Sequence, residues 1–238
     1  PNLLQTLEHT PVIVHAGPFG NIAHGNSSIV GDLIGIRGGD YLITEAGFGA
    51  DMGAERFFNI KCRASGMTPD AAVLVATVRA LKAHSGKFKI TPGKPLPADL
   101  LAENPDDVRA GAANLIKQIE NVKVHGVSPV VAINAFPGDY ESEHQAIREI
   151  AESVGARVAV CRHFSEGGAG ATELAQAVVE ACDEPTQFQF CYESSDSLKT
   201  KIEKVATKIY GAAKVTYSAA ANTQLDRYEK NGFGTLPV

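Results

Sequence analysis

The segment 47–53 is the first part of the sequence that could do chemistry. Its glycines follow G-x-G-x-x-x-G spacing, between an apolar run at 41–44 and a helix-like pattern that begins at Asp51. A strand, a glycine turn and a helix can bind an anion through free backbone N–H groups and the helix dipole. The carboxylates of Glu45 and Asp51 flank this turn and are suited to binding Mg²⁺ through water molecules. For Asp51, capping of the following helix is an equally good explanation. The spacing exceeds the dinucleotide fingerprint by about one residue, so a close helix–strand crossing that needs small residues is an equal alternative.

Two phenylalanines follow apolar runs that have the character of strands. Phe136 comes after 130–134, and Phe164 comes after 157–161. A planar ligand ring held between two aromatic side chains gains stacking and buried area. The alternative is that each ring packs under its own loop.

Other sequence motifs of known chemistry are missing. The Gly-Lys pairs at 86–87 and 93–94 lack the Ser or Thr and the upstream glycine of a Walker A loop. The sequence contains no G-x-S-x-G elbow. The four cysteines form no C-x-x-C pair and have no histidines at zinc spacing. We therefore expect buried free thiols and a reducing cytoplasm.

The composition is that of a globular protein without a nucleic-acid or membrane surface. The chain has 238 residues, 44% of them hydrophobic and 21% charged, with a net charge of −5. No basic block appears, which argues against nucleic acid and anionic membranes as partners. The longest apolar runs are far shorter than a membrane span.

Apolar runs and amphipathic patterns alternate along the chain. Strands are predicted at 11–16, 41–44, 71–77, 130–134, 157–161, 188–192 and 215–217. Helices are predicted at 27–36 (capped by Asn26 or Ser27), from Asp51, and at 106–125, 142–154 (with a Ser142/Gln145 capping box), 171–182, 197–210 and 222–230. This alternation predicts an α/β fold, a three-layer, mostly parallel sheet with helices on both faces.

Ligands of such sheets bind beyond the carboxyl ends of the strands. The predicted strands end near Ala16, Thr44, Asn134 and Cys161. We expect the loops that follow them to gather on one rim, which is the best indication of a site from the residues alone.

Long motifs spread over the whole chain resemble the formate–tetrahydrofolate ligase family. They include Gly17-Pro18-Phe19, Asn21-Ile22-Ala23-His24-Gly25, Thr44-Glu45-Ala46-Gly47-Phe48-Gly49-Ala50-Asp51, Val75-Ala76-Thr77-Val78-Arg79-Ala80-Leu81-Lys82, Asn134-Ala135-Phe136, Glu166-Gly167-Gly168 and Lys208-Ile209-Tyr210-Gly211-Ala212. The resemblance implies a P-loop-NTPase-like ligase fold that is incomplete in this chain.

The resemblance implies a folate site. Phe136 with Pro137 corresponds to one side of the slot for the folate pterin ring. Phe164 stands where the family usually has Trp, as the opposite wall, with less stacking surface and no indole N–H. The resemblance assigns no role to Glu45 or Asp51.

The resemblance also implies a nucleotide site beside the folate slot. Phe19 and Asn21 correspond to a loop that contacts nucleotide and the formyl phosphate intermediate, and they are the candidates nearest to the chemistry. Asn134 is similar to a polar residue at the floor of that site. We therefore expect a nucleotide-binding part at 1–135 and a folate-side part at 136–238.

The implied reaction is the ATP-dependent joining of formate to tetrahydrofolate. Formate attacks the γ-phosphate to give formyl phosphate, and the folate N10 then takes the formyl group. The resemblance implies ATP with Mg²⁺, with a monovalent cation as a further option, and a cytoplasmic homotetramer. It places the P-loop and a catalytic arginine upstream of residue 1 and further chain after residue 238. We therefore expect the chain to be a fragment that is inactive alone.

Two other interpretations remain at this stage. The first is a free-standing folate- or nucleotide-binding domain that has lost catalysis. The second is a nucleotide-dependent dehydrogenase on a doubly wound sheet, which depends only on the glycine turn at 47–53.

Overall fold

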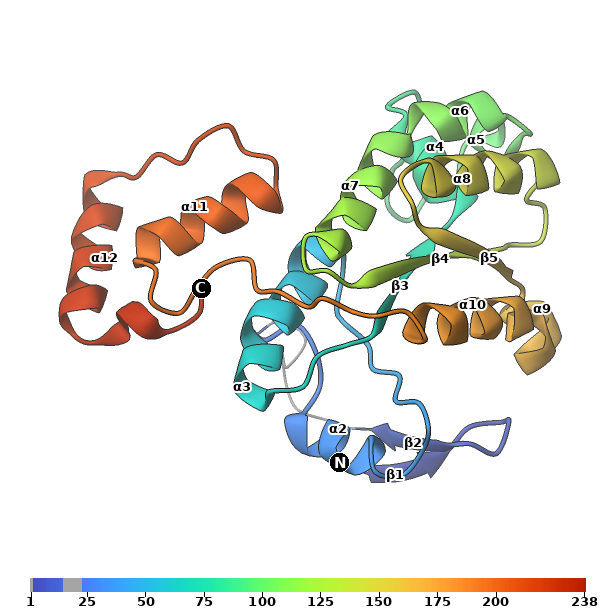
Figure 1. The fold of residues 1–238 in the computed structure, drawn as a ribbon. Coiled ribbons are helices and arrows are strands. Elements are labelled where there is room, and N and C mark those ends of the chain that lie inside the picture. Colours follow the sequence, from blue (N-terminus) through green and yellow to red (C-terminus); the bar gives the residue numbers. More distant parts are fainter. Residues whose placement is uncertain (1, 15–22) are drawn as a thin grey trace. The chain divides into compact units, whose positions relative to one another are not determined.

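A computed structural model describes residues 2–14 and 23–238. The chain divides into two compact units, each described by itself (Figure 1). Unit 1 comprises Pro1–Thr68 and Phe188–Val238, and unit 2 comprises Pro69–Gln187. The predicted division at residue 135 concerns which ligand each part contacts, and it stays a prediction.

Unit 2 contains a parallel three-stranded sheet in the order β3-β4-β5. The strands are β3 (Ala71–Ala76), β4 (Ser128–Asn134) and β5 (Arg157–Cys161). Ala76 pairs with Ile133, and Asn134 pairs with Cys161, so the three carboxyl ends lie along one edge. The predicted strands at 71–77, 130–134 and 157–161 are confirmed, and so is the α/β fold.

Helices cover both faces of this sheet. Helix α10 (Thr172–Cys182) packs on one face, and α7 (Ala112–Lys123) and α8 (Glu141–Ser153) pack on the other (Figure 1). Helices α4 (Val78–His84) and α6 (Pro105–Ala110) pack against α7 and α8. The central strand β4 is buried almost throughout, as its continuous apolar run predicts for a parallel strand.

The remaining elements of unit 2 are short. They are α5 (Ala98–Leu101), α9 (His163–Glu166) and a 3₁₀ turn at Gly167–Ala171. The predicted helix at 171–182 is confirmed as α10, one residue shorter.

Two predicted helices of unit 2 differ in the structure. The segment expected as one helix at 106–125 is two helices, α6 and α7, with Gly111 between them at φ −91° and ψ 6°. A Cβ at Gly111 would lie 1.7 Å from the carbonyl oxygen of Leu81 in α4, so only glycine fits there. The Ser142/Gln145 capping box is wrong. Helix α8 begins one residue earlier, and its Glu143 carboxylate accepts the N–H of the N-cap Tyr140 at 3.3 Å.

The N-terminal part of unit 1 does not form parallel strands. Strands β1 (Asn2–Gln5) and β2 (Pro11–Val14) make an exposed antiparallel hairpin, so the buried parallel strand predicted at 11–16 is wrong in its described part. Helix α2 (Ile29–Gly35) is capped by Ser28 rather than by Asn26 or Ser27. The segment 41–44, predicted as a strand, has no regular secondary structure and pairs with no strand within 2–14 and 23–238.

The other regular elements described in unit 1 are helices and helical turns. The segment that follows Gly49 has π-helical geometry at Ala50–Ala54 and Phe57–Cys62, and it ends in α3 (Arg63–Ser65). Helices α11 (Leu198–Lys208) and α12 (Ala219–Lys230) confirm the amphipathic predictions, and a 3₁₀ turn lies at Phe233–Thr235. The strands expected at 188–192 and 215–217 do not form. Among the described residues, no helix has both the length and the apolar character needed to cross a bilayer.

Candidate functional site

The carboxyl edge of the unit 2 sheet carries both predicted folate-slot phenylalanines. Asn134 is the last residue of β4, and Phe136 follows it with 39% of its surface exposed. Phe164 lies in α9, directly after the neighbouring strand β5, and is 83% exposed. Because β4 and β5 are parallel neighbours, both aromatic loops leave the sheet at the same edge.

Hydrogen bonds hold the Phe136 loop in a fixed turn. The Ala135 N–H donates to the Cys161 carbonyl at 3.0 Å, which extends the β4–β5 pairing by one residue. The Phe136 N–H donates to Asp139 Oδ2 at 2.9 Å, and the Asp139 N–H donates back to the Phe136 carbonyl at 3.1 Å. The turn predicted at 135–139 is confirmed, and it presents Phe136 and Pro137 to solvent.

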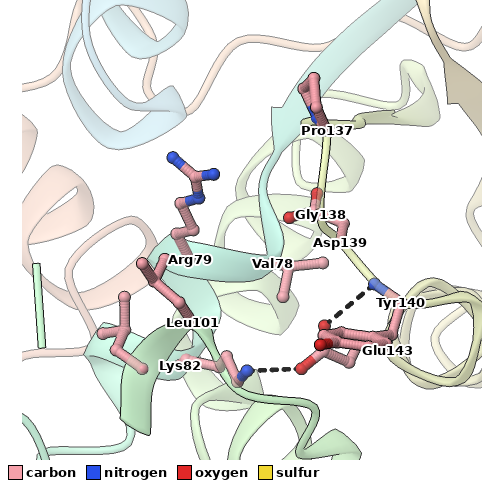
Figure 2. A pocket seen from close by; sticks show the side chains of 10 residues that line it. Val78, Arg79, Lys82, Leu101, Pro137, Gly138, Asp139, Tyr140 and Glu143 are labelled. Atoms are coloured by element: carbon pink, nitrogen blue, oxygen red, sulfur yellow. Dashed lines mark hydrogen bonds and ion pairs between the residues drawn. The ribbon is translucent and has the colours of Figure 1, made fainter. Parts of the chain in front are cut away.

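A cavity of about 280 Å³ lies beside this loop, between it and helices α4 and α5 (Figure 2). Val78, Leu100 and Leu101 are its apolar wall residues, and Pro137 joins it to the Phe136 loop. Its size suits part of a ligand rather than a whole folate, since sites for drug-sized molecules measure roughly 300–1,000 Å³.

An ion pair closes the floor of the cavity. Lys82 Nζ and Glu143 Oε1 lie 2.5 Å apart, and both side chains are 1% exposed (Figure 2). Lys82 also donates to the Ala102 carbonyl at 2.5 Å, and Glu143 Oε1 accepts the Asn104 N–H at 2.9 Å. Burying this pair without such partners would be costly, so the network fixes α4, α8 and the chain around Ala102 relative to one another.

The glycine turn of unit 1 is a close backbone packing site. A Cβ on Gly53 would lie 1.8 Å from the Gly47 carbonyl oxygen, so only glycine fits there. The Gly47 N–H donates to the Gly25 carbonyl at 3.0 Å, and the Gly53 N–H donates to the Gly49 carbonyl at 3.0 Å. These N–H groups are therefore committed within the fold. The structure supports the close-crossing interpretation.

A buried polar network lies behind this turn. Lys61 Nζ is 2.6 Å from Asp32 Oδ2 and also donates to Asn26 Oδ1. The Thr44 hydroxyl donates to the same Asn26 oxygen at 2.9 Å, and Asn26 Nδ2 donates to the Glu45 carbonyl at 2.9 Å. The backbone before the glycine turn is thus held by side chains rather than by a sheet.

The helical segment after the turn contains two groups with shifted protonation equilibria. Burial raises the pKa of Glu55, and a hydrogen bond from Asn59 Nδ2 to Glu55 Oε1 at 2.8 Å opposes that rise. Burial raises the pKa of the Cys62 thiol to about 12. Cys62, Cys161 and Cys191 are buried free thiols as predicted, whereas Cys182 is only partly buried.

The other predicted site residues are placed as follows. Phe19 and Asn21 lie outside the described residues. Glu45 is exposed, and Asp51 lies in the first turn of the π-helical segment, whose N-cap is Gly49. Within 2–14 and 23–238, no group of three or more His, Cys, Asp or Glu side chains could hold a metal ion.

Unit 2 is thus a parallel α/β unit whose exposed aromatic loops lie where proteins of this class bind small ligands. The chain belongs to the formate–tetrahydrofolate ligase family, which its sequence matches along residues 1–238.

Curated relatives agree with the family match. The chain is 68% identical to formate–tetrahydrofolate ligase of Saccharopolyspora erythraea, over 100% of the chain and 42% of that relative. It is 65% identical to formate–tetrahydrofolate ligase 3 of Rubrobacter xylanophilus (100% and 43%) and 61% identical to the ligase of Cutibacterium acnes (100% and 42%). The chain therefore spans about two fifths of the length of these relatives.

Proposed function

We propose that the protein to which this chain belongs ligates formate to tetrahydrofolate with ATP, and that unit 2 supplies its folate slot. Membership of the ligase family supports the reaction. The observation that carries the slot is the position of Phe136 and Phe164, exposed aromatic residues in the loops after neighbouring parallel strands. Ligands of parallel α/β sheets bind beyond the carboxyl ends of the strands, which is where both rings lie.

In this proposal each residue of the loop has a physical task. The turn closed by Asp139 holds Phe136 at the carboxyl edge, so that its ring stacks on one face of the pterin. Pro137 restricts the backbone next to that ring. Phe164 forms the second wall with less area than the Trp that is usual in the family, so folate binds less tightly than it would against an indole.

The proposal extends to the nucleotide and the assembly. Phe19, Asn21 and Asn134 are proposed nucleotide-side residues within 1–135, and 136–238 is the proposed folate side. ATP is proposed to act with Mg²⁺, and a monovalent cation is a further option. The described residues include no group of three or more His, Cys, Asp or Glu side chains that could hold a metal ion. A homotetramer in the cytoplasm completes the proposal, and the free cysteines support a reducing compartment.

Binding of a reduced folate to the 238-residue chain tests the slot. Phe136→Ala should weaken the affinity for 5-formyltetrahydrofolate by roughly 1–3 kcal/mol, measured by isothermal titration calorimetry, because the stacking surface is lost. Phe164→Trp should tighten binding, because the indole offers more area. Formate-, ATP- and tetrahydrofolate-dependent synthesis of 10-formyltetrahydrofolate by the protein that contains the chain tests the reaction.

Phe233→Ala is the matched control for these variants. Phe233 is also an exposed phenylalanine, at 48%, but it lies in the 3₁₀ turn of unit 1 and packs against Tyr228. Its replacement should leave folate affinity unchanged. Equal affinities of the wild-type and Phe136→Ala chains would contradict the slot assignment.

A further inference from the structure

Arg79 reaches the Phe136 loop from helix α4, which follows the neighbouring strand β3. Strand β3 ends at Ala76, and Thr77 caps helix α4 by accepting the Ala80 N–H at 3.1 Å. This cap places Arg79 in the first turn of α4, at the same sheet edge as the loop that follows β4. Both partners of the contact are therefore held in place: Arg79 by helix α4, and Phe136 by the hydrogen-bonded turn after β4.

The guanidinium of Arg79 stacks on the Phe136 ring. Its Cζ lies 4.5 Å from the ring centroid, within the range of cation–π contacts. A planar guanidinium covers the face of a ring better than an ammonium does. The exposed 39% of Phe136 is then what remains for a ligand. The Asp139 hydrogen bond fixes the backbone of Phe136, and Arg79 fixes its ring.

No carboxylate competes for this guanidinium within the described part of the chain. The other arginines of unit 2, Arg109, Arg148, Arg157 and Arg162, all make ion pairs with Glu or Asp. For Arg79 no such pair is found among the described residues, and Figure 2 shows its side chain pointing away from the Lys82–Glu143 pair. The interaction that places the Arg79 head group is thus its contact with Phe136.

We propose that Arg79 is a positioning residue of the folate slot, which holds the Phe136 ring by covering one face and leaves the opposite face for the pterin. This inference rests on the proposed folate-binding function. The inference adds Arg79, a residue of helix α4, to the slot formed by Phe136 and Phe164. Without the guanidinium, the ring would lose the contact that covers one of its faces, and its orientation would be less restricted.

The sequence offers a clean reporter for ring position, because it contains no tryptophan. Phe136→Trp introduces a single indole at the slot. In that background Arg79→Met should shift the emission maximum and increase quenching by acrylamide, in the absence of any ligand. Arg79→Lys should give an emission maximum and quenching between those of the Phe136→Trp protein and its Arg79→Met variant, because lysine keeps the positive charge but lacks the planar guanidinium. A role in stability alone would not change the indole signal of a folded variant.

Folate affinity in the Phe136 background gives the second readout. Arg79→Met should weaken binding of 5-formyltetrahydrofolate about 2- to 30-fold, and Arg79→Lys should lose less. The matched control is Arg109→Met, which removes an exposed arginine paired with Asp106 and Glu149 on the same unit. That variant should bind folate like the wild type.

The outcomes separate this inference from the proposed function. If wild-type protein binds no reduced folate, the proposed function fails, and the ligand-free indole signal still decides whether Arg79 positions residue 136. If folate binds but Arg79→Met changes neither affinity nor indole signal, the inference is overturned. If Arg79→Met does not fold, Arg79→Lys decides: a weakened affinity with a shifted indole supports the proposal, and wild-type behaviour overturns it.

Discussion

Each compact unit supports a loop with a buried lysine, but the two lysines act in different settings. Lys82 of unit 2 pairs with Glu143 beneath a loop that a parallel sheet already positions. Lys61 of unit 1 pairs with Asp32 and donates to Asn26 behind a glycine turn. The chain before that turn pairs with no strand in the part of the chain that the structure describes. In unit 2 the hydrogen bonds between parallel strands fix the position of the loop, and the ion pair adds to them. In unit 1 the side-chain network fixes the position of the chain before the glycine turn.

The largest effect is expected from Lys82→Met. It leaves the Glu143 carboxylate buried without its cation and should lower the free energy of unfolding by about 3–5 kcal/mol, measured by urea denaturation. The double variant Lys82→Met/Glu143→Gln should lose less than the sum of the single changes. Lys117→Met, which breaks an exposed pair with Glu120, should cost about 0–1 kcal/mol. An equally small cost for Lys82→Met would show that the sheet alone holds the loop.

A smaller loss of stability is expected from Lys61→Met, with a distinct local signature. The Asp32 side chain is 10% exposed, so water can solvate part of the carboxylate that the variant leaves unpaired. We therefore expect the free energy of unfolding to fall by about 3 kcal/mol, the lower end of the range for a broken buried ion pair. The Gly47 amide, which bonds to the Gly25 carbonyl, should exchange its hydrogen faster in this variant and not in Lys82→Met. Unchanged exchange at Gly47 would contradict a network that sets the turn.

The smallest effect is expected from Glu55→Gln, and it depends on pH. Burial raises the pKa of Glu55 in the folded state, so its contribution to stability is complete below the unfolded pKa and is lost as pH rises through the folded pKa. The variant should therefore be more stable than the wild type at pH 7 and nearly equal at pH 4, measured by thermal unfolding. Gln keeps an oxygen for the Asn59 hydrogen bond. A variant that is less stable at pH 7 would reverse the sign and exclude this account.

The difference between the sheet of unit 2 and the side-chain network of unit 1 also explains which elements could be predicted from the sequence. The strands of unit 2 are continuous apolar runs buried between helices, and such runs are predictable from the residues alone. The runs at 11–14 and 41–44 look similar, but the first forms an exposed antiparallel hairpin, and the second has no regular secondary structure among the described residues. Local patterns do not encode which partner a strand will find.

The site was predicted to a similar extent. The types and positions of Phe136 and Phe164 indicate a stacking slot, and their shared sheet edge agrees with that prediction without testing it. Arg79 was missed, because a lone arginine in the first turn of a short helix carries no local signal. Its contact with Phe136 joins residues 57 positions apart and depends on strand order. The close approach of α4 to Gly111 is likewise a tertiary contact, which no local pattern in the sequence indicates.

The two ends of unit 2 meet, since the Thr186 hydroxyl donates to the Asp70 carbonyl at 3.0 Å. Unit 2 is thus an insertion between the two segments of unit 1. On a ribosome, unit 2 can complete its sheet before Phe188–Val238 has been synthesised, whereas unit 1 has to wait for that segment. Once folded, unit 2 brings the segments of unit 1 together as a short closed loop would, which removes most of the entropy cost of joining them. The order of synthesis and the order of folding therefore differ for the segment of unit 1 that precedes unit 2.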